Sequence, residues 1–586
     1  MTSGSDPGQR ASGPHGDSDA DSATGMRAGC PHRDPRRTAK LSAVGFAIIA
    51  VVLIGVYFPA ASYSTIPTWD DTSFVVFRPE IIDWWGASWW DRLVNPAIGY
   101  PIPIPTALYA FLRSIFGENG YFQALHRIHI GIHLLNTWLV WRLARSWLAG
   151  TQASRCDSGT RASCPHYNSV IPLGLTAAWA FHPVLVESVA WLTNTKTLLS
   201  ATAILGALLL QERVRHDHAS IGAVADLVCF FLLAIGSRPD GAILPWVLMA
   251  VLLAQEGLSS IKKHKTWSAG LSVLLAASLP YMAWASSMHE GVAERRASPL
   301  SPIAELLFRM GRAVQLSATS IGFPLELHPS YFYSPQSTVV DGLPGLAIIV
   351  LVLGVGFWAW RRQKPLVLTG TALLTVTFLP YSNLVHLPRL AADTYLYLPT
   401  FGVILMAVGM INSRRAAIFV SLAAALIGAA LTFSQVHRWE NAITLWEPVI
   451  AYEPDGGRSY RHVAFAYYVD ENWEKAAQAI EAGLPHFASE RDIPWYAIPI
   501  LREARGPLPA VEVGMRAALT NTTVDPLVQK SLLETLMIGK IPMPPDPEVR
   551  KVIVDAAKVY RSNAEWMANP SAGPAIDSYL IANGVQ

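Results

Sequence analysis

The sequence predicts an all-α membrane protein, with a polytopic transmembrane domain of about 11 helices followed by a C-terminal helical domain. Two observations carry this prediction. Hydrophobic residues make up 51% of the 586 residues and charged residues only 15%, whereas a soluble domain is about one-quarter charged. Apolar stretches close to the roughly 20 residues that a bilayer-crossing helix needs recur between residues 41 and 433. The net charge of +2 gives no reason to expect nucleic acid as a partner.

The first 40 residues are predicted to form a disordered cytoplasmic N-terminus. Residues 1–40 are rich in Gly, Ser, Asp, Pro and Arg and contain almost no apolar side chains, a composition that cannot bury a core. This stretch is too long to be the charged start of a cleaved signal peptide, so the apolar run after it is interpreted as a retained span. Cys30, Cys156, Cys164 and Cys229 are interpreted as free thiols, because none falls in a segment expected outside the cytoplasm.

The transmembrane domain, residues 41–433, contains eleven apolar stretches that qualify or nearly qualify as spans. They are residues 41–60, 123–142, 170–187, 196–212, 219–236, 241–257, 267–286, 343–360, 365–382, 396–411 and 415–433. Clusters of Arg and Lys, which mark cytoplasmic loops, fall in alternate loops of this arrangement. The N-terminus is therefore expected in the cytoplasm, and an odd number of spans places the C-terminus outside.

Four segments share the outer side in this topology: loops 59–122, 287–342 and 383–395, and the tail, residues 434–586. The modest loop lengths favour a bacterial inner membrane with a periplasmic tail, or the ER membrane if the host is eukaryotic. Chemistry on this side of the membrane would have to use residues of these segments.

An adjacent pair of carboxylates, Asp70-Asp71, follows the first span. Two acids beside a bilayer are costly to hold there unless they bind or catalyse something. The predicted topology puts both on the outer side. The pair is therefore the leading candidate for catalysis, with a helix cap or a cation site as the alternative.

The tail is predicted to be a helical domain outside the membrane, because its charge rises and its apolar residues take amphipathic spacing. One stretch resembles a tetratricopeptide (TPR) repeat. The matching positions are Tyr460, Val463, Ala464, Tyr467, Trp473, Ala476, Ile480 and Gly483. Glu471 stands where that repeat has its usual glycine. Stacked repeats of this kind present a concave peptide-binding face; a plain helical cap on the membrane domain is the alternative.

Four motifs, taken in order, carry a family resemblance. They are Trp69-Asp70-Asp71 with Arg78-Pro79; His126 to Asn136; Phe181-His182-Pro183 with Glu187 to Trp191 and Lys196; and Asp393 to Pro399. Together they resemble the multi-spanning, TPR-containing protein O-mannosyltransferases and their bacterial relatives. That family belongs to the GT-C class, which takes sugars from polyprenyl-phosphate donors. The resemblance covers about residues 41–490.

The chain departs from the family pattern at four positions. His129 stands where relatives often carry Asn, and Thr195 and Thr197 stand where a basic and an acidic residue are common. Thr394 replaces an arginine. This last change removes a phosphate ligand, for which Arg389 could substitute from nearby.

The resemblance implies an inverting transfer in which an aspartate takes the proton of the attacking acceptor hydroxyl. It assigns this general base to Asp70, with Asp71 orienting the acceptor or holding Asp70 in place. The departing phosphate needs cations near the outer leaflet. The candidates are Lys196, Arg238 and Arg389, in that order of preference, and each could instead snorkel to lipid headgroups.

Further pocket candidates are His126, His182, Glu187, Asp393 and Tyr395. His182 and Glu187 could hydrogen-bond a sugar or bridge helices, and bridging is slightly favoured. Tyr395 is interpreted first as a membrane-interface anchor and second as a stacking surface for lipid or sugar. His126 shares a helix face with two more histidines, and such a seam more often lines helix contacts than binds metal. No metal or other cofactor is firmly predicted.

The predicted function is a membrane glycosyltransferase that moves a sugar, mannose in the resembled family, from a polyprenyl-phosphate carrier to a Ser/Thr hydroxyl of a protein. The expected partners are the lipid-linked sugar, an acceptor protein or peptide bound through the tail, and membrane lipids. Three alternatives stay open: the same donor chemistry on a lipid or glycan acceptor, a transporter, and a non-catalytic scaffold. The acids gather at one face and no internal repeat is visible, which argues against a transporter.

Overall fold

The computed structural model describes residues 35–584 apart from a set of shorter segments. Those left out are residues 67–68, 72–74, 77–78, 89, 91, 93–99, 157–169, 217–219, 290–299, 332–337, 388, 488–493, 495, 520–525, 544–546 and 563–571. All regular secondary structure in the described residues is helical, which confirms the all-α prediction. The predictions for residues 1–34, and for Cys30 and Cys164, lie outside the described residues. Cys229 is an exposed free thiol.

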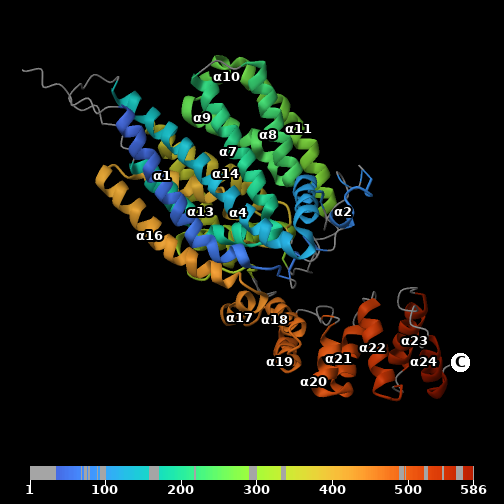
Figure 1. The fold of residues 1–586 in the computed structure, drawn as a ribbon. Coiled ribbons are helices and arrows are strands. Elements are labelled where there is room, and N and C mark those ends of the chain that lie inside the picture. Colours follow the sequence, from blue (N-terminus) through green and yellow to red (C-terminus); the bar gives the residue numbers. More distant parts are fainter. Residues whose placement is uncertain are drawn as a thin grey trace, which may run out of the picture.

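Helices α1 to α16 form a bundle that we call the helical body (Figure 1). Its longer helices are α1 (Pro35–Tyr57), α4 (Pro103–Cys156), α5 (Val170–Ala180), α7 (Thr195–His216), α8 (Ile221–Ser237), α9 (Leu244–Glu256), α11 (Lys265–His289), α12 (Pro302–Gly322), α13 (Leu343–Arg361), α14 (Pro365–Phe378), α15 (Pro399–Met410) and α16 (Arg414–Arg438). Its short helices are η1 (Phe58–Ser62), α2 (Pro79–Ile82), η3 (Pro183–Leu185), α6 (Val186–Ala190), η4 (Leu192–Asn194), η5 (Pro239–Ile243), α10 (Ser259–Lys263), η6 (Val339–Gly342), η7 (Leu379–Tyr381) and η8 (Asp393–Leu396).

Five helical segments of the described chain are long and apolar enough to cross a membrane. They are Lys40–Ser62, Leu192–His216, Lys265–Ser287, Val339–Arg361 and Arg414–Arg438. A sixth is added if Val170–Ala180 and Pro183–Ala190, which are bent by 51°, count as one span. Four of the five bury only 17–28% of their apolar window in the protein, so most of their apolar surface faces outward, as lipid contact requires.

Ten of the eleven predicted spans each lie mainly in one helix, and the eleventh, 170–187, runs across the bent pair. About half of the eleven are shorter or more polar than a span needs. Helix α9, for example, has 13 residues, which at about 1.5 Å per residue is roughly 20 Å. Helix α4 contains the predicted span 123–142 but runs much further and bends at Gly117, whose φ of 70° lies in the left-handed region that suits glycine.

Helix α7 lies in the centre of the body, with 72% of its apolar window buried, and packs against α4 and α8. Helices α14 and α15 pack closely, through Gly370 and Gly402. A Cβ atom at either glycine would lie 2.5 Å from a backbone nitrogen of the other helix. This packing holds the segment between α14 and α15, which contributes to the site described below.

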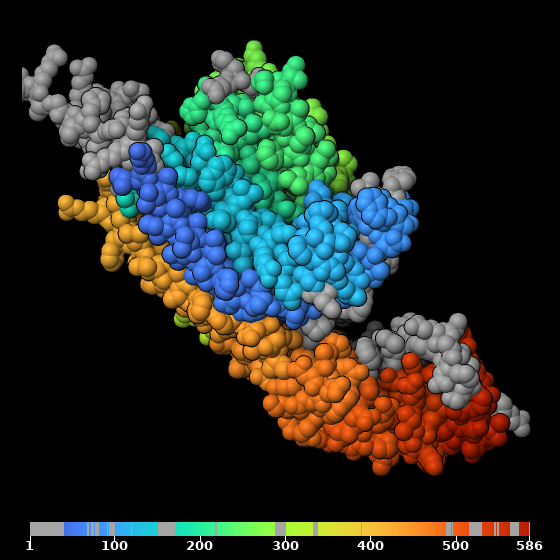
Figure 2. Space-filling view, viewed as in Figure 1, coloured from blue at the N-terminus to red at the C-terminus, as the bar shows by residue number. Residues whose placement is uncertain are grey.

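Helices α17 to α24, which we call the tail domain, extend from one end of the body, opposite to α10 (Figure 1). They are α17 (Ala442–Tyr452), α18 (Gly457–Val469), α19 (Trp473–Gly483), α20 (Ala497–Arg505), α21 (Pro507–Leu519), α22 (Pro526–Ile538), α23 (Pro547–Ser562) and α24 (Ala572–Ala582), with the short η9 (Leu484–His486) after α19. Each packs on its neighbours in sequence, which is the arrangement of a helical stack. In space-filling view the first part of this domain is continuous with the body (Figure 2).

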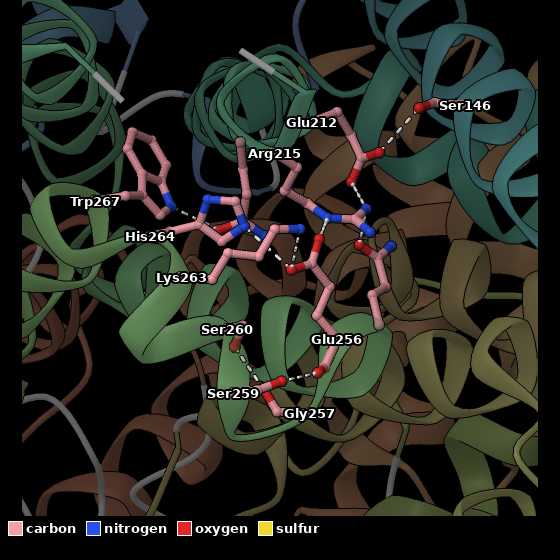
Figure 3. Close-up of polar contacts among 12 residues, drawn as sticks. Ser146, Glu212, Arg215, Glu256, Gly257, Ser259, Ser260, Lys263, His264 and Trp267 are labelled. Atoms are coloured by element: carbon pink, nitrogen blue, oxygen red, sulfur yellow. Dashed lines mark hydrogen bonds and ion pairs between the residues drawn. The ribbon is translucent and has the colours of Figure 1, made fainter. Parts of the chain in front are cut away.

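A cluster of charged residues ties the helices together at the α10 end of the body (Figure 3). The Arg215 guanidinium contacts Glu212 at 2.8 Å and Glu256 at 2.7 Å. The Glu256 carboxylate in turn accepts from Lys263 at 3.2 Å and from His264 at 3.1 Å. The cluster links α7 to α9, to α10 and to the residue between α10 and α11, so it fixes the end of the body that lies away from the tail domain.

Candidate functional site

A cavity of about 550 Å³ lies between the helical body and the tail domain. Its wall combines the loop after α1, the start of α7, the α8–η5 turn, α11, the segment between α14 and α15, and α18. The lining residues are Trp69, Asp70, Tyr100, Asn194, Lys196, Arg238, Pro239, Asp240, Met282, Ala285, Ser286, Pro380, Tyr381, Val385, His386, Leu387, Arg389, Thr394, Tyr395, Arg458, Arg461 and His462. Five of the ten predicted site residues are among them: Asp70, Lys196, Arg238, Arg389 and Tyr395.

The two adjacent acids have different surroundings. Asp70 lines the cavity and is partly exposed, whereas Asp71 points into the protein and is only 1% exposed. The Asp71 carboxylate accepts hydrogen bonds from Ile66 N at 2.9 Å, Thr193 N at 3.1 Å and Thr193 Oγ1 at 2.6 Å. Burial raises the pKa of Asp71 to about 6, against the lowering effect of those hydrogen bonds. Asp71 therefore anchors the loop, and Asp70 is the carboxylate that faces the cavity.

Trp69 fixes the position of Asp70 relative to both domains. Its ring centroid lies 5.8 Å from that of Trp191 in the body, and 5.0 Å from those of Trp446 and His462 in the tail domain. Trp446 and His462 stack on each other at 4.2 Å. Because Asp70 follows Trp69 directly, this aromatic cluster holds its backbone where the body meets α18.

All three predicted phosphate ligands line the cavity. Lys196 Nζ donates to the Tyr100 hydroxyl at 2.9 Å. Arg238 caps α8, pairs with Asp240 at 3.2 Å, and donates to the hydroxyl of Thr197 at 2.7 Å. The three cations therefore come from separate elements that are distant in sequence, and the fold brings them to one cavity.

Arg389, the third cation, pairs with the buried carboxylate of Glu187 at 2.8 Å and also donates to the Pro329 carbonyl. Tyr395 lies between Arg389 and Arg238, whose guanidinium carbons are 5.5 and 5.8 Å from its ring centroid. Cation–π contacts of this kind hold guanidinium groups in place. Tyr395 is only 8% exposed. Most of its ring therefore packs inside the protein, where it supports the two arginines, and the rest lines the cavity.

Glu187 and Asp393 lie behind the cavity wall. The second carboxylate oxygen of Glu187 accepts from Thr394 N at 2.9 Å, so Glu187 bridges two segments. Asp393 accepts from the Tyr331 hydroxyl at 2.6 Å. Burial, and then the charge of Glu187, raises the pKa of Asp393 well above its usual value.

The histidine candidates also lie outside the cavity wall. His182 Nε2 is 3.1 Å from the Ile321 carbonyl oxygen, and its Nδ1 accepts from the first turn of η3. His126 Nε2 is 3.4 Å from the Ser64 carbonyl oxygen. His129 contacts Thr195 at 2.6 Å. These rings connect segments of the body, and no group of three or more His, Cys, Asp or Glu in the described residues is arranged to hold a metal ion.

Thr394 also lines the cavity, with Arg389. Its hydroxyl bonds to Asn194 at 3.1 Å and to Thr197 at 3.2 Å, so it joins the network that supports Arg238. Glu187 contacts both Arg389 and the Thr394 backbone, so the two residues are held close together in the wall.

Sequence reasoning missed the contribution of the tail domain, which is Arg458, Arg461 and His462 on α18. Arg458 and Arg461 are three residues apart and therefore share a helix face. That spacing is visible in the sequence, between the repeat-like core positions. Nothing in the sequence shows that this face meets Asp70.

A second cavity, also of about 550 Å³, is mainly apolar. It is lined by Trp84, Arg92, Pro103, Ile104, Ala107, Leu232 and Gly236. We call it the apolar groove. Gly236 is two residues before Arg238, and the Arg92 guanidinium carbon lies 5.2 Å from the Trp84 ring centroid. The groove is therefore lined by residues of α4 and α8 and by the loop before α4.

No protein-family model, curated protein or solved structure matches this chain. Its function is therefore inferred from the residues that line these two cavities.

Proposed function

We propose that this protein is a GT-C-type membrane glycosyltransferase that moves a sugar from a polyprenyl-phosphate carrier to a Ser/Thr hydroxyl of an acceptor protein. The observation that carries the proposal is a single cavity in which a partly exposed aspartate, Asp70, shares the wall with Lys196, Arg238 and Arg389. A base and a set of phosphate-binding cations are the two parts that this reaction needs.

In the proposed reaction the acceptor hydroxyl attacks the anomeric carbon of the donor sugar. The new carbon–oxygen bond forms as the bond to the phosphate oxygen breaks, so the anomeric configuration inverts. Asp70 takes the hydroxyl proton, and the polyprenyl phosphate leaves with its charge next to Lys196, Arg238 and Arg389. The ion pairs and aromatic contacts of Arg238 and Arg389 hold these groups in position before the reaction, which lowers the cost of reorganisation.

The apolar groove supports a lipid carrier. Its lining residue Gly236 is two residues before Arg238, and Leu232 of α8, also in its wall, is 56% exposed. A prenyl chain in this groove would put its phosphate near Arg238. A soluble nucleotide sugar would make no use of an apolar channel at that place.

The proposal includes a complete topology of eleven spans with a cytoplasmic N-terminus, in a bacterial inner membrane. The shorter helices α8, α9, α14 and α15 would then cross as members of a bundle and not singly. The tail domain would be a TPR-like stack in the periplasm that brings the acceptor to Asp70. Its consecutive helix packing supports this assignment.

The test is Asp70→Asn in the full-length protein, with Asp83→Asn as the matched control. Asp83 is an exposed aspartate of the same loop and does not line the cavity. With polyprenyl-phosphate mannose as the donor probe, we expect Asp70→Asn to lose roughly 10²- to 10⁴-fold in transfer rate. Mass spectrometry of periplasmic proteins should show a hexose on Ser or Thr in cells with wild-type protein or Asp83→Asn, and not with Asp70→Asn. Full transfer by Asp70→Asn would refute the role of this residue as base.

A further inference from the structure

The segment between α12 and η6 reaches the back of the cavity wall. Within it, residues 327–331 form a stretch that we call the clamp loop. Residues 327–330 are all buried, although no helix includes them, and none of the five lines the cavity. A buried loop has to satisfy its backbone polar groups inside the protein. Its contacts therefore show what holds it and what it holds.

The end of the body and the start of the tail domain both hold the clamp loop. The Leu327 carbonyl accepts from Gln435 at 3.1 Å and from Arg438 at 3.3 Å, both in the last turns of α16. The His328 ring stacks on Tyr452 of α17, with centroids 6.3 Å apart. The position of this loop is therefore set by two helices that do not line the cavity.

Arg389 is the cavity residue that the clamp loop holds. Its Nη1 atom donates to the Pro329 carbonyl at 2.9 Å and to Glu187 at 2.8 Å. A guanidinium has its five N–H donors in one rigid plane, so two acceptors on the same nitrogen fix the orientation of that plane. A phosphate in the cavity would then be bound through the other two nitrogens, Nε and Nη2.

Tyr331 ties the clamp loop to the other side of this ion pair. Its hydroxyl donates to Asp393 at 2.6 Å, and the backbone N–H of the residue after Asp393 donates to Glu187. Glu187 pairs with Arg389, which returns to the loop through the Pro329 carbonyl, so the contacts form a closed ring. Burial, and then the charge of Asp393, raises the pKa of the Tyr331 hydroxyl, so this group stays protonated and remains a donor.

We propose that Tyr331 is a positioning residue of the transfer reaction, which holds the Arg389 guanidinium in place for the departing phosphate. This inference rests on the proposed function and gives a role in it to the predicted outer loop 287–342. A cation that is already in place stabilises developing charge without reorganisation, whereas ordering a mobile side chain on binding costs affinity. Because Tyr331 does not line the cavity, it acts only through Arg389 and Glu187.

The experiment measures the binding of polyprenyl phosphate, the leaving group of the proposed reaction, to full-length protein in detergent. Tyr331→Phe removes only the hydroxyl, and we expect it to weaken binding roughly two- to tenfold, the factor that one hydrogen bond provides. The same change is then made in Glu187→Gln/Arg389→Gln, which we call the neutral-pair background. There it should change binding by less than about twofold, because changes that act through the same groups are not additive.

Tyr579→Phe is the matched control. It also removes a hydrogen-bonded tyrosine hydroxyl, which donates to the Ile541 carbonyl at 3.0 Å, but Tyr579 lies in α24 and does not line the cavity. It should leave the binding of polyprenyl phosphate unchanged. If Tyr331→Phe does not fold, Asp393→Ala removes the acceptor of the same hydrogen bond and takes its place in the comparison.

The inference is overturned if Tyr331→Phe weakens binding equally in both backgrounds, or in neither. Thermal unfolding of the same proteins separates it from the proposed function. Tyr331→Phe should lower the Tm more in the wild-type background than in the neutral-pair background, whereas Tyr579→Phe should lower it equally in both. If this difference appears but wild-type protein does not bind polyprenyl phosphate, the proposed function fails and the hold of Tyr331 on Arg389 stands. If Tyr331→Phe shifts the Tm equally in both backgrounds, the inference fails.

Discussion

Asp71 offers the sharpest test of how the structure divides the acid pair. The residue is 1% exposed, and burial raises the pKa of its carboxyl group from 3.8 to about 6. A carboxyl whose pKa is higher in the folded state favours folding most at low pH, below the unfolded value. That contribution is lost as pH rises through the folded pKa. Asp71→Asn removes the titration and keeps the side-chain shape.

The size of the effect follows from the two pKa values. The difference of about 2 pH units, at roughly 1.4 kcal/mol per unit, gives about 3 kcal/mol. Between pH 4 and pH 7, wild-type protein should therefore lose about 3 kcal/mol of stability relative to Asp71→Asn. In detergent solution this should appear as a Tm that falls more steeply with pH in wild type.

The assay is thermal unfolding of both proteins at half-unit steps from pH 4 to pH 8, with Asp83→Asn as an exposed control. Asp83→Asn should follow the wild-type curve. Parallel curves for wild type and Asp71→Asn would refute the claim that Asp71 ionises in a buried site. Transfer activity supplies the second readout, because replacing a positioning residue in Asp71→Asn should lower the transfer rate less than Asp70→Asn does.

Three further perturbations test the wall of the cavity, the groove and the body. Glu187→Gln leaves the Arg389 guanidinium without its 2.8 Å ion-pair partner. Breaking a buried ion pair costs about 3–5 kcal/mol of stability, so calorimetry should show a lower Tm. An unchanged Tm would contradict a stabilising role for this pair. Ala107→Phe fills the apolar groove and should raise the KM for long-chain donors more than for short-chain donors, whereas Ala424→Phe on the exposed face of α16 should change neither. Gly402→Val puts a Cβ 2.5 Å from the α14 backbone and should destabilise the body by about 1–3 kcal/mol, measured by thermal unfolding; wild-type stability would show that α14 and α15 can separate at no cost.

The helices of the body were predictable because burial in lipid or in protein demands the same apolar runs. The number of spans was not. Helix α7 and helix α16 both read as apolar runs, yet α7 is largely buried in protein and α16 faces outward. A hydropathy pattern measures how apolar a segment is, and it does not record which neighbour covers it.

The candidate site likewise has features that the sequence predicts and features that it does not. The sequence by itself determined that Asp70 and Asp71 are adjacent acids after an apolar run and that Lys196, Arg238 and Arg389 stand near ends of others. Their assembly in one cavity depends on packing between residues more than 100 positions apart. No local pattern encodes that distance.

Only the tertiary structure decided which acid faces the cavity and which partners the cations have. Asp71 is buried because Ile66 and Thr193 donate hydrogen bonds to it, and Thr193 lies 122 residues away in sequence. The α18 arginines reach the cavity because Trp69 packs on the tail domain. The residue type sets which chemistry a side chain is capable of. Its solvent exposure and charged neighbours decide which of these roles it takes, and both arise only when distant segments pack together.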